Sequence, residues 1–184
     1  MQVEKTDLEG VVIITPDVFS DERGFFFESF QEKRYQEILG SDVCFVQDNV
    51  SRSTKNVLRG LHYQAPPFGQ AKLVSVLAGA VLDVAVDIRE GSPTYGKHVA
   101  IELSAENHKQ LFIPEGFAHG FIVKSDTALF AYKCTNVYSK EHDRGILWND
   151  AALGIAWEVS QPVISPKDGN HPILADAPKE YFFK

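Results

Sequence analysis

Short apolar runs separated by Gly, Pro, Asn and Asp recur along most of the chain. Runs of this kind are typical of β-strands, and the residues between them supply turns. Gly79 and the stretch Pro114–Gly116 are two such turns. The strands that we expect span residues 11–14, 24–28, 45–50, 72–77, 80–88, 97–103, 110–113, 118–124 and 128–135. Closely spaced strands with little helix between them predict an all-β sandwich or barrel.

One helix is predicted between the second and third of these strands. Ser29 and Glu32 form the S-x-x-E pattern of a capping box, which satisfies free backbone amides at the start of a helix. Gly40 fits the residue that ends a helix, because glycine adopts a left-handed conformation at little cost. The apolar residues that share one helical face between these ends are Phe30, Tyr35, Ile38 and Leu39.

The chain has 184 residues, which is enough for one domain with one hydrophobic core. No repeat, low-complexity tract or linker divides it, so we expect a single domain over residues 1–184. The segment from Gln161 to Pro178 carries four prolines. It predicts an irregular arm, with at most short helical turns, that lies against the barrel.

Charge and cysteine content exclude several classes of protein. There are 18 Lys and Arg against 25 Asp and Glu, a net charge of −7, which argues against a sequence-independent nucleic-acid binder. Two cysteines are too few for a disulfide framework. No apolar segment reaches the roughly 18 residues of a membrane helix, and no signal-peptide pattern begins the chain. We therefore expect a cytoplasmic protein with neither nucleic acid nor membrane as a partner.

The stretch Arg59–Gln64, with the sequence R-G-L-H-Y-Q, is the first candidate for chemistry. A histidine titrates near neutral pH, so His62 could take a proton from carbon or oxygen. A nearby cation such as Arg59 or Lys72 could stabilise developing negative charge. The alternative is that His62 is a surface histidine or a core histidine with its hydrogen bonds satisfied.

Two aspartates interrupt the apolar strand predicted over residues 80–88. Asp83 and Asp87 share one side of that strand, and an unpaired aspartate is costly to bury. Either both face solvent from an edge strand, or Asp83 points into the barrel and pairs with Lys72 or a histidine.

The stretch Pro114–Phe121 contains P-x-G-x-x-H followed by an apolar strand, and it resembles the second motif of the cupin superfamily. In cupins, which are double-sheet jelly rolls, the corresponding histidine points into the barrel, as we expect of His119. A metal-binding cupin would also carry H-x-H and a glutamate in its first motif. The corresponding stretch, His62–Gln64, has neither a second histidine nor a glutamate, so we expect a metal-free site.

The sequence pattern alone does not decide the roles of two tyrosines. Tyr132 lies within a predicted strand and fits a barrel residue whose hydroxyl finds a partner. Tyr138 follows in a predicted turn, where it is either a stacking surface for a base or an exposed tyrosine without a role.

Taken together, these stretches resemble one family, the dTDP-4-dehydrorhamnose 3,5-epimerases. The stretches that match in order are R-G-L-H-Y-Q, Q-A-K-L-V (70–74), D-V-A-V-D-I-R (83–89), S-P-T-Y-G-K (92–97), L-F-I-P-E-G-F-A-H-G-F (111–121) and W-N-D (148–150). The resemblance implies a mainly β, cupin-type double-sheet jelly-roll barrel with a few short helices. It also implies inversion of C3 and C5 of dTDP-4-dehydro-6-deoxy-D-glucose through enolates, in dTDP-L-rhamnose biosynthesis, without a metal or other cofactor.

The resemblance implies four catalytic residues. His62 would be the base that takes the C3 and C5 protons, and Asp168 would orient it. Lys72 would stabilise the enolate oxygen, because a cation lowers the energy of developing negative charge. Tyr132 would deliver a proton to the opposite face of the sugar ring.

The resemblance also implies a binding set for the dTDP-4-keto-6-deoxy sugar nucleotide. Tyr138 would stack on thymine, and Asp143 stands where we expect a glutamate in the family. The other residues implied in binding are Arg59 and His119 at the sugar and phosphates, Arg23, Glu28, Gln47 and Asn49 at the nucleotide, and Lys167 near the end of the chain. The family implies a homodimer with exchanged N-terminal strands, so the strand that carries Arg23 and Glu28 would serve the partner's site.

Three alternatives follow from the same residues. A single-centre epimerase of a related dTDP-deoxysugar pathway would keep His62, Lys72 and Tyr132, and would exchange hydrogen at one carbon only. A non-catalytic cupin that only binds a sugar nucleotide would have lost the base or the acid. A metal-dependent cupin oxygenase would need the ligands that the first motif lacks.

Overall fold

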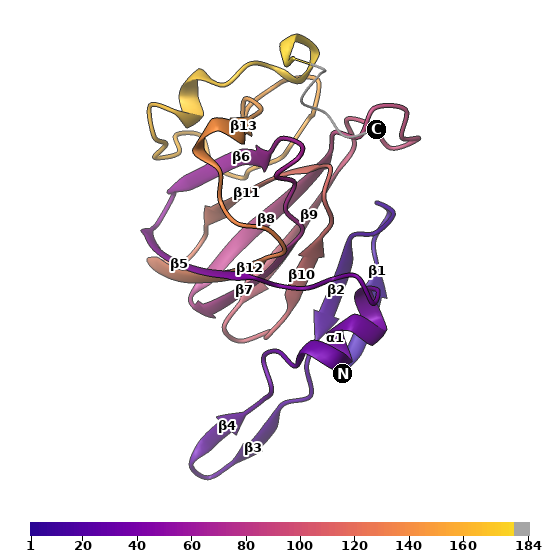
Figure 1. Ribbon diagram of the computed structural model, residues 1–184. Helices are drawn as coiled ribbons and strands as arrows, with labels where there is room; N and C mark the ends of the chain where they lie inside the picture. The colour runs from indigo at the N-terminus through magenta and orange to yellow at the C-terminus, as the bar shows by residue number, and fades with distance from the viewer. Residues whose placement is uncertain (179–184) are drawn as a thin grey trace.

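Two antiparallel sheets pack face to face in the computed structural model, which describes residues 1–178. Figure 1 shows the two sheets enclosing the interior of a barrel. In spatial order, the larger sheet contains β1 (Gln2–Lys5), β2 (Val12–Thr15), β10 (Gln110–Ile113), β7 (Lys72–Ala78), β12 (Thr127–Cys134) and β5 (Gln47–Thr54). The smaller sheet contains β13 (Asp143–Gly145), β6 (Leu58–Gln64), β11 (Phe117–Val123), β8 (Ala80–Asp87) and β9 (His98–Ser104). The prediction of a mainly β, cupin-type jelly roll is confirmed.

Little of the described chain is helical. The helical elements are α1 (Glu32–Leu39) and the short 3₁₀ turns η1 (Lys140–His142), η2 (Asp168–Asn170) and η3 (Leu174–Asp176). Over residues 1–178, no helix is long and apolar enough to cross a membrane. A separate hairpin of β3 (Phe19–Asp21) and β4 (Gly24–Phe26) projects away from the barrel in Figure 1. Its Phe19, Phe25 and Phe26 side chains are exposed.

All of the strands that the pattern predicts are present, with ends shifted by a few residues at most. The structure adds β1, β3, β6 and β13. β6 carries an arginine, a glycine and a histidine in seven residues, so it lacks the apolar alternation of a half-buried strand. Its pairing with β11 and β13 makes it a strand nonetheless.

The predicted start of the helix is wrong. The N-cap is Gln31, whose side chain accepts a hydrogen bond from the Arg34 amide at 2.6 Å, so Ser29 lies outside the helix. The Ser29 carbonyl instead accepts hydrogen bonds from Tyr35 and Gln110, which tie this segment to the barrel. At the other end Gly40 is the C-cap, as predicted, and its amide donates to the Gln36 carbonyl at 2.9 Å.

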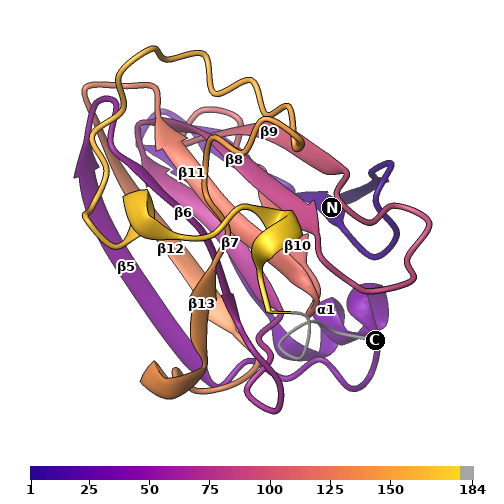
Figure 2. The same ribbon diagram turned by 90° about the horizontal axis from the view of Figure 1, so that it is seen from above.

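Apolar side chains form one cluster on each face of the smaller sheet, and a third cluster packs α1 against the larger sheet. Val81 and Ala85 of β8 point into the barrel interior, whereas Val84 and Val86 belong to a cluster on the outer face. The C-terminal arm covers that outer face, and Figure 2 shows it running across the strands. Leu174 and Ala177 of the arm predicted over residues 161–178 pack there beside Leu153 and Trp157, which confirms that the arm lies against the barrel.

Asp83 and Asp87 are both fully buried, so the solvent-facing interpretation is wrong. Asp87 at the end of β8 accepts hydrogen bonds from the Arg89 side chain and amide and from the Ser92 and Thr94 hydroxyls, all within 3.0 Å. Burial alone would raise the pKa of this carboxyl, but these hydrogen bonds outweigh burial and lower the pKa to about 2. Asp87 therefore fixes the loop that follows β8.

We predict that Asp87→Asn destabilises the protein, and that the difference from the wild type shrinks in acid. The folded carboxyl has a lowered pKa, so its stabilisation is present above the unfolded pKa near 3.8 and is lost as pH falls towards 2. The difference in unfolding free energy should narrow by about 1 kcal/mol between pH 7 and pH 3. Urea unfolding of both proteins at the two pH values measures it. A pH-independent difference would contradict the assignment.

Candidate active site

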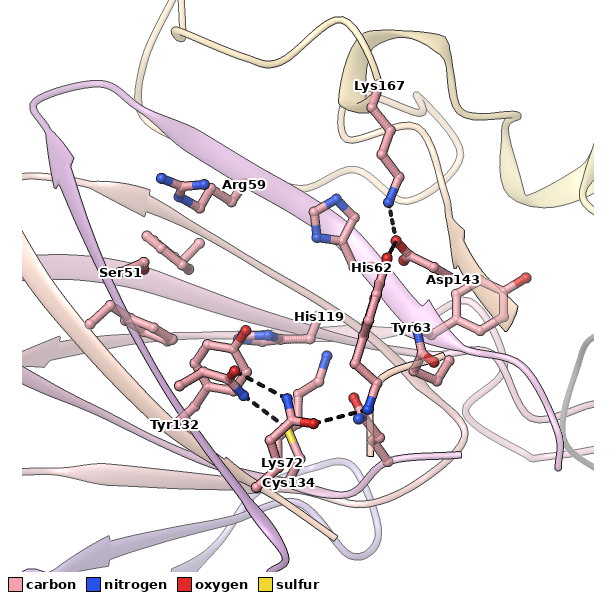
Figure 3. A pocket seen from close by; sticks show the side chains of 17 residues that line it. Ser51, Arg59, His62, Tyr63, Lys72, His119, Tyr132, Cys134, Asp143 and Lys167 are labelled. Carbon is pink, nitrogen blue, oxygen red and sulfur yellow. Dashed lines mark hydrogen bonds and ion pairs between the residues drawn. The ribbon is translucent and has the colours of Figure 1, made fainter. Parts of the chain in front are cut away.

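A cavity of about 470 Å³ opens between the two sheets, and Figure 3 shows side chains entering it from both. Ten of the residues implicated in catalysis or binding line it: Gln47, Asn49, Arg59, His62, Lys72, His119, Tyr132, Tyr138, Asp143 and Lys167. Asp168 lies behind His62 and completes the predicted catalytic set. The sequence positions of these residues are far apart, and the barrel brings them to one place.

The larger sheet presents its pocket residues by simple alternation. Tyr132 and Cys134 of β12 lie two positions apart, as do Gln47 and Asn49 of β5, and all four line the cavity. Tyr132 pairs in register with Asn49. Lys72 enters from the start of β7, next to the end of β12.

In the smaller sheet, two glycines that face each other allow the pocket residues of β6 to reach the cavity. Gly60 of β6 has φ +132°, and a Cβ there would lie 2.6 Å from the Cα of Gly120. The strand register shifts at this point, between the His119–His62 pair and the next pair along β11. Residues three apart in a regular strand face opposite sides, so this shift lets both Arg59 and His62 reach the cavity.

His62 forms a short hydrogen bond to the C-terminal arm, between its Nε2 and Asp168 Oδ1 at 2.6 Å. Burial would raise the pKa of Asp168, but hydrogen bonds from His62, the Gly60 amide and Ser165 outweigh it and lower the pKa. An ionised carboxylate can only accept, so His62 Nε2 is the donor. That leaves Nδ1 as the ring nitrogen free to take a proton.

Tyr132 and Lys72 face the cavity from the opposite sheet to His62, as Figure 3 shows. Burial raises the pKa of the Tyr132 hydroxyl, and the neighbouring Cys134 adds to the shift. Burial lowers the pKa of Lys72, against the attraction of neighbouring groups that include Asp83. Tyr132 thus stays protonated at neutral pH and can donate a proton.

His119 lies beneath this group and is held by a buried carboxylate. Its Nε2 is 2.9 and 3.0 Å from the two oxygens of Asp83. Asp83 thus points into the barrel and pairs with a histidine, which is the second of the two interpretations of this aspartate. The pairing fixes the imidazole of His119 against the floor of the cavity.

Asp143 joins two other side chains at the cavity mouth. The Tyr138 hydroxyl donates to Asp143 Oδ2 at 2.9 Å, and Lys167 forms an ion pair with the same oxygen. The Tyr138 residue is 53% exposed. The three residues form a polar rim of the cavity, and Figure 3 shows Asp143 and Lys167 beside His62.

Arg23 and Glu28 are not brought to the cavity of their own chain. Arg23 is at the tip of the projecting hairpin, 84% exposed, and pairs with Asp21. Glu28 pairs with Arg34 at 2.9 Å on the surface. Neither residue lines the cavity between the sheets, and Glu28 lines a separate pocket with Phe19, Phe26 and Arg34.

Seven further residues line the cavity beyond the predicted set: Ser51, Tyr63, Gln64, Gln70, Phe121, Phe130 and Cys134. Several lie within stretches that the sequence singles out, such as Tyr63 and Gln64 in R-G-L-H-Y-Q. Phe121 and Phe130 stack at 4.1 Å between ring centroids and form an apolar wall. Alternation along β5 and β12 was the signal available for Ser51 and Cys134.

One group of three potential metal ligands occurs in the described part of the chain. It consists of His62, Asp168 and His171, whose ligand atoms all lie within 4.8 Å of one another. It lies at the back of the cavity, behind His62. The position that a second histidine would take in a metal-binding cupin holds Gln64.

Comparisons with known proteins agree with this geometry. A profile of the dTDP-4-dehydrorhamnose 3,5-epimerase family matches residues 5–176. The dTDP-4-dehydrorhamnose 3,5-epimerase of Shigella flexneri is 57% identical over 182 residues, 99% of each chain. A dTDP-4-dehydrorhamnose 3-epimerase of Streptomyces niveus is 37% identical, over 96% of this chain and 86% of its own.

A solved structure extends the agreement to the fold. The crystal structure of dTDP-6-deoxy-D-glucose-3,5-epimerase from Legionella pneumophila, in complex with dTDP-4-keto-L-rhamnose, is 52% identical to this chain. It superposes with a TM-score of 0.97 over 100% of this chain and 97% of that one. Since both sequence and fold match over nearly the whole length, this chain belongs to the dTDP-4-dehydrorhamnose 3,5-epimerase family.

Proposed function

We propose that this chain inverts C3 and C5 of dTDP-4-dehydro-6-deoxy-D-glucose to give dTDP-4-dehydro-L-rhamnose, in dTDP-L-rhamnose biosynthesis. The Legionella relative binds dTDP-4-keto-L-rhamnose, the product of this reaction. A cavity of about 470 Å³ is large enough for a sugar and part of a nucleotide.

The observation that carries the proposal is the opposition of the two sheets across the cavity. A histidine held by a carboxylate enters from β6, and a protonated tyrosine and a lysine enter from β12 and β7. Inversion of a carbon centre needs one group to remove a proton on one face and another to supply a proton on the opposite face. Groups on facing sheets meet this need without moving.

In the first half-reaction His62 Nδ1 takes the proton from C3 or C5, and the C–H electrons move into an enolate at the C4 oxygen. His62 becomes an imidazolium, which the Asp168 carboxylate stabilises through the 2.6 Å hydrogen bond. Lys72 lies on the opposite side of the cavity, where its ammonium would stabilise the enolate oxygen.

In the second half-reaction Tyr132 gives its hydroxyl proton to the same carbon from the other face. The enolate electrons return to form the new C–H bond, and the C4 ketone is restored. Because the pKa of Tyr132 is raised, its hydroxyl stays protonated until it transfers the proton to the enolate carbon. Proton exchange with solvent resets His62 and Tyr132, and the sequence repeats at the other carbon.

The remaining lining residues would hold the nucleotide and the sugar. The guanidinium of Arg59 lies beside Ser53 at 3.1 Å and suits a phosphate oxygen, and the open ring of Tyr138 suits thymine. Gln47 and Asn49 offer amides to the base and sugar, Lys167 offers a cation at the rim, and His119 borders the sugar.

We further propose that the active form is a cytoplasmic homodimer of single-domain chains with exchanged N-terminal strands. Arg23 and the exposed phenylalanines Phe25 and Phe26 sit on a hairpin that projects away from its own barrel. Apolar side chains on a projecting hairpin favour burial against another copy of the chain. In that arrangement Arg23 and Glu28 would reach the partner's nucleotide site.

A single-centre epimerase is the second candidate, because the Streptomyces niveus relative is a 3-epimerase. The identity to that relative is 37%, against 57% for the 3,5-epimerase of Shigella flexneri, which favours double inversion. Proton NMR of dTDP-4-keto-6-deoxyglucose in D₂O distinguishes the two, with a 4-keto reductase and NADPH present to trap the product. Deuterium at C3 and C5 with trapped dTDP-L-rhamnose is expected. Exchange at one carbon supports the single-centre enzyme, and exchange at neither overturns the epimerase proposal.

We predict that His62→Ala loses exchange at both carbons together, because one base serves both. The loss of a general base lowers the rate by about 10² to 10⁴-fold. His98→Ala removes a histidine of β9 outside the cavity and should keep the wild-type rate. Deuterium uptake measured at each carbon tests this. Loss of exchange at only one carbon would mean that a second base exists.

Tyr132→Phe should separate proton removal from inversion. His62 can still remove and return a proton on its own face, so deuterium enters the substrate with retained configuration, while epimerised product falls by about 10² to 10⁴-fold. Tyr95→Phe, outside the cavity, is the matched control. NMR of the substrate and of the trapped product gives the two rates. An equal fall in exchange and in inversion would contradict the assignment of Tyr132 as the acid.

Mixing two inactive variants tests the exchanged hairpin. We expect Arg23→Ala and His62→Ala each to be inactive, the first through lost binding. In a mixed dimer one site would combine an intact hairpin with an intact barrel, so co-refolded protein should recover roughly a quarter of wild-type activity. No recovery, with mixed dimers demonstrated by mass spectrometry, would place Arg23 at its own chain's site or at none.

A further inference from the structure

His171 is a histidine that the reaction does not use, and it lies against the catalytic pair. It follows η2, and its ring meets the His62 ring edge-on at 5.8 Å between centroids. Its Nε2 is 3.9 Å from Asp168 Oδ1. That nitrogen is buried and has no hydrogen-bond partner within residues 1–178. An unsatisfied buried nitrogen costs free energy, which calls for a function.

The fold makes room for this ring. Gly145 of β13 stands where a Cβ would lie 2.4 Å from His171 Nε2 and 2.6 Å from the Leu61 carbonyl oxygen. Gly145 is also the register partner of His62. Any larger residue at 145 would clash with the His171 ring and with the Leu61 backbone, so the ring could not keep this position. The glycine thus keeps three ligand-type side chains together at one point.

We propose that His62, Asp168 and His171 form a binding site for a divalent transition-metal ion, best suited to Zn²⁺, and that the bound ion inhibits the enzyme. Two imidazole nitrogens and one carboxylate oxygen are a common ligand set for zinc. All three ligand atoms lie within 4.8 Å of one another. Zinc bonds of about 2.0 to 2.2 Å therefore need only small side-chain rotations.

A metal ion can reach this site from the cavity, and its binding forms more bonds than it breaks. The His62 side chain is 32% exposed at the cavity, so an ion and a water molecule as fourth ligand can approach from that side. Binding replaces the single His62–Asp168 hydrogen bond by three metal–ligand bonds. It also gives His171 Nε2 the partner that it lacks. Lys167 does not compete for the site, because its ammonium pairs with Asp143.

Inhibition follows from the proton on the His62 ring. A neutral imidazole carries one proton, and here it is on Nε2, which donates to Asp168. A metal ion on Nε2 needs the lone pair of that nitrogen, so the proton moves to Nδ1. Nδ1 then has no lone pair left to take a proton from C3 or C5. This consequence rests on the proposed function, whereas metal binding itself does not.

Calorimetric titration of the metal-free full chain with ZnCl₂ tests the site. We expect one tight site per chain, and at least about tenfold weaker binding in His171→Gln. His98→Gln removes a histidine outside the group and should bind as the wild type does. Co²⁺ in the wild type should give the strong visible absorption of four-coordinate cobalt. Equal zinc affinity in the wild type and in His171→Gln would overturn the proposal.

Inhibition is measured as the rate of deuterium exchange with added ZnCl₂, relative to each protein's own metal-free rate. Wild type and His98→Gln should be inhibited and should recover with EDTA, while His171→Gln should need at least about tenfold more zinc.

If His171→Gln does not fold, zinc anomalous scattering from wild-type crystals must place the ion between the three side chains. Zinc bound there without inhibition overturns the inhibitory half. Zinc bound there in a chain without exchange activity overturns the proposed function and leaves the site standing.

Discussion

The hydrogen bond between His62 and Asp168 joins the two parts of the molecule on which the site depends. His62 belongs to the barrel, and Asp168 belongs to the C-terminal arm 106 positions later. Leu174 of the arm packs with Trp157 on the outer face of the smaller sheet. Asp150 also holds the arm, because its Oδ2 accepts a hydrogen bond from the Leu174 amide at 2.8 Å. The orientation of the His62 imidazole therefore depends on apolar packing well outside the cavity.

A second constraint is the distance between the sheets, which the barrel interior sets. Phe121 of β11 and Phe130 of β12 stack on each other across the interior and pack the two sheets together. His62 and Tyr132 then face each other over a space that a sugar ring can occupy. Because the proposed base and acid are on opposite sheets, the proposed inversion needs no large movement of the protein. The same packing has two effects. It buries Tyr132, which raises the pKa of its hydroxyl, and it places the Asp168 carboxylate that orients His62.

Much of the fold could be predicted from the sequence because its signals are local, whereas most residues of the candidate site were implied by the resemblance to the family. Strands such as β10 and β12 follow from apolar runs, and His62 and His119 lie in short motifs. The other features depend on contacts distant in sequence. β6 is a strand through its pairing with β11 and β13. The N-cap of α1 is Gln31, and the Ser29 carbonyl instead accepts hydrogen bonds from Tyr35 and Gln110.

The same limit applies to charged and polar side chains. The sequence pattern did not decide whether Asp83 faces solvent or the barrel interior. Asp83 is buried because His119 on the adjacent strand is its hydrogen-bond partner. His171 carried no signal, since its significance comes from Asp168 three residues earlier and from Gly145 on another strand. For Arg23 and Glu28 the sequence suggested a binding role, but neither side chain lines the cavity between the sheets of its own chain.

The tautomer of His62 tests most directly the claim that Asp168 prepares this ring as a base. Long-range ¹⁵N–¹H correlation spectra of the wild-type protein, recorded at a pH where the ring is neutral, distinguish a protonated ring nitrogen from a free one. The structure predicts a proton on Nε2 and a free lone pair on Nδ1. A neutral ring with its proton on Nδ1 would contradict the claim, because the nitrogen left free would then face the carboxylate instead of the cavity.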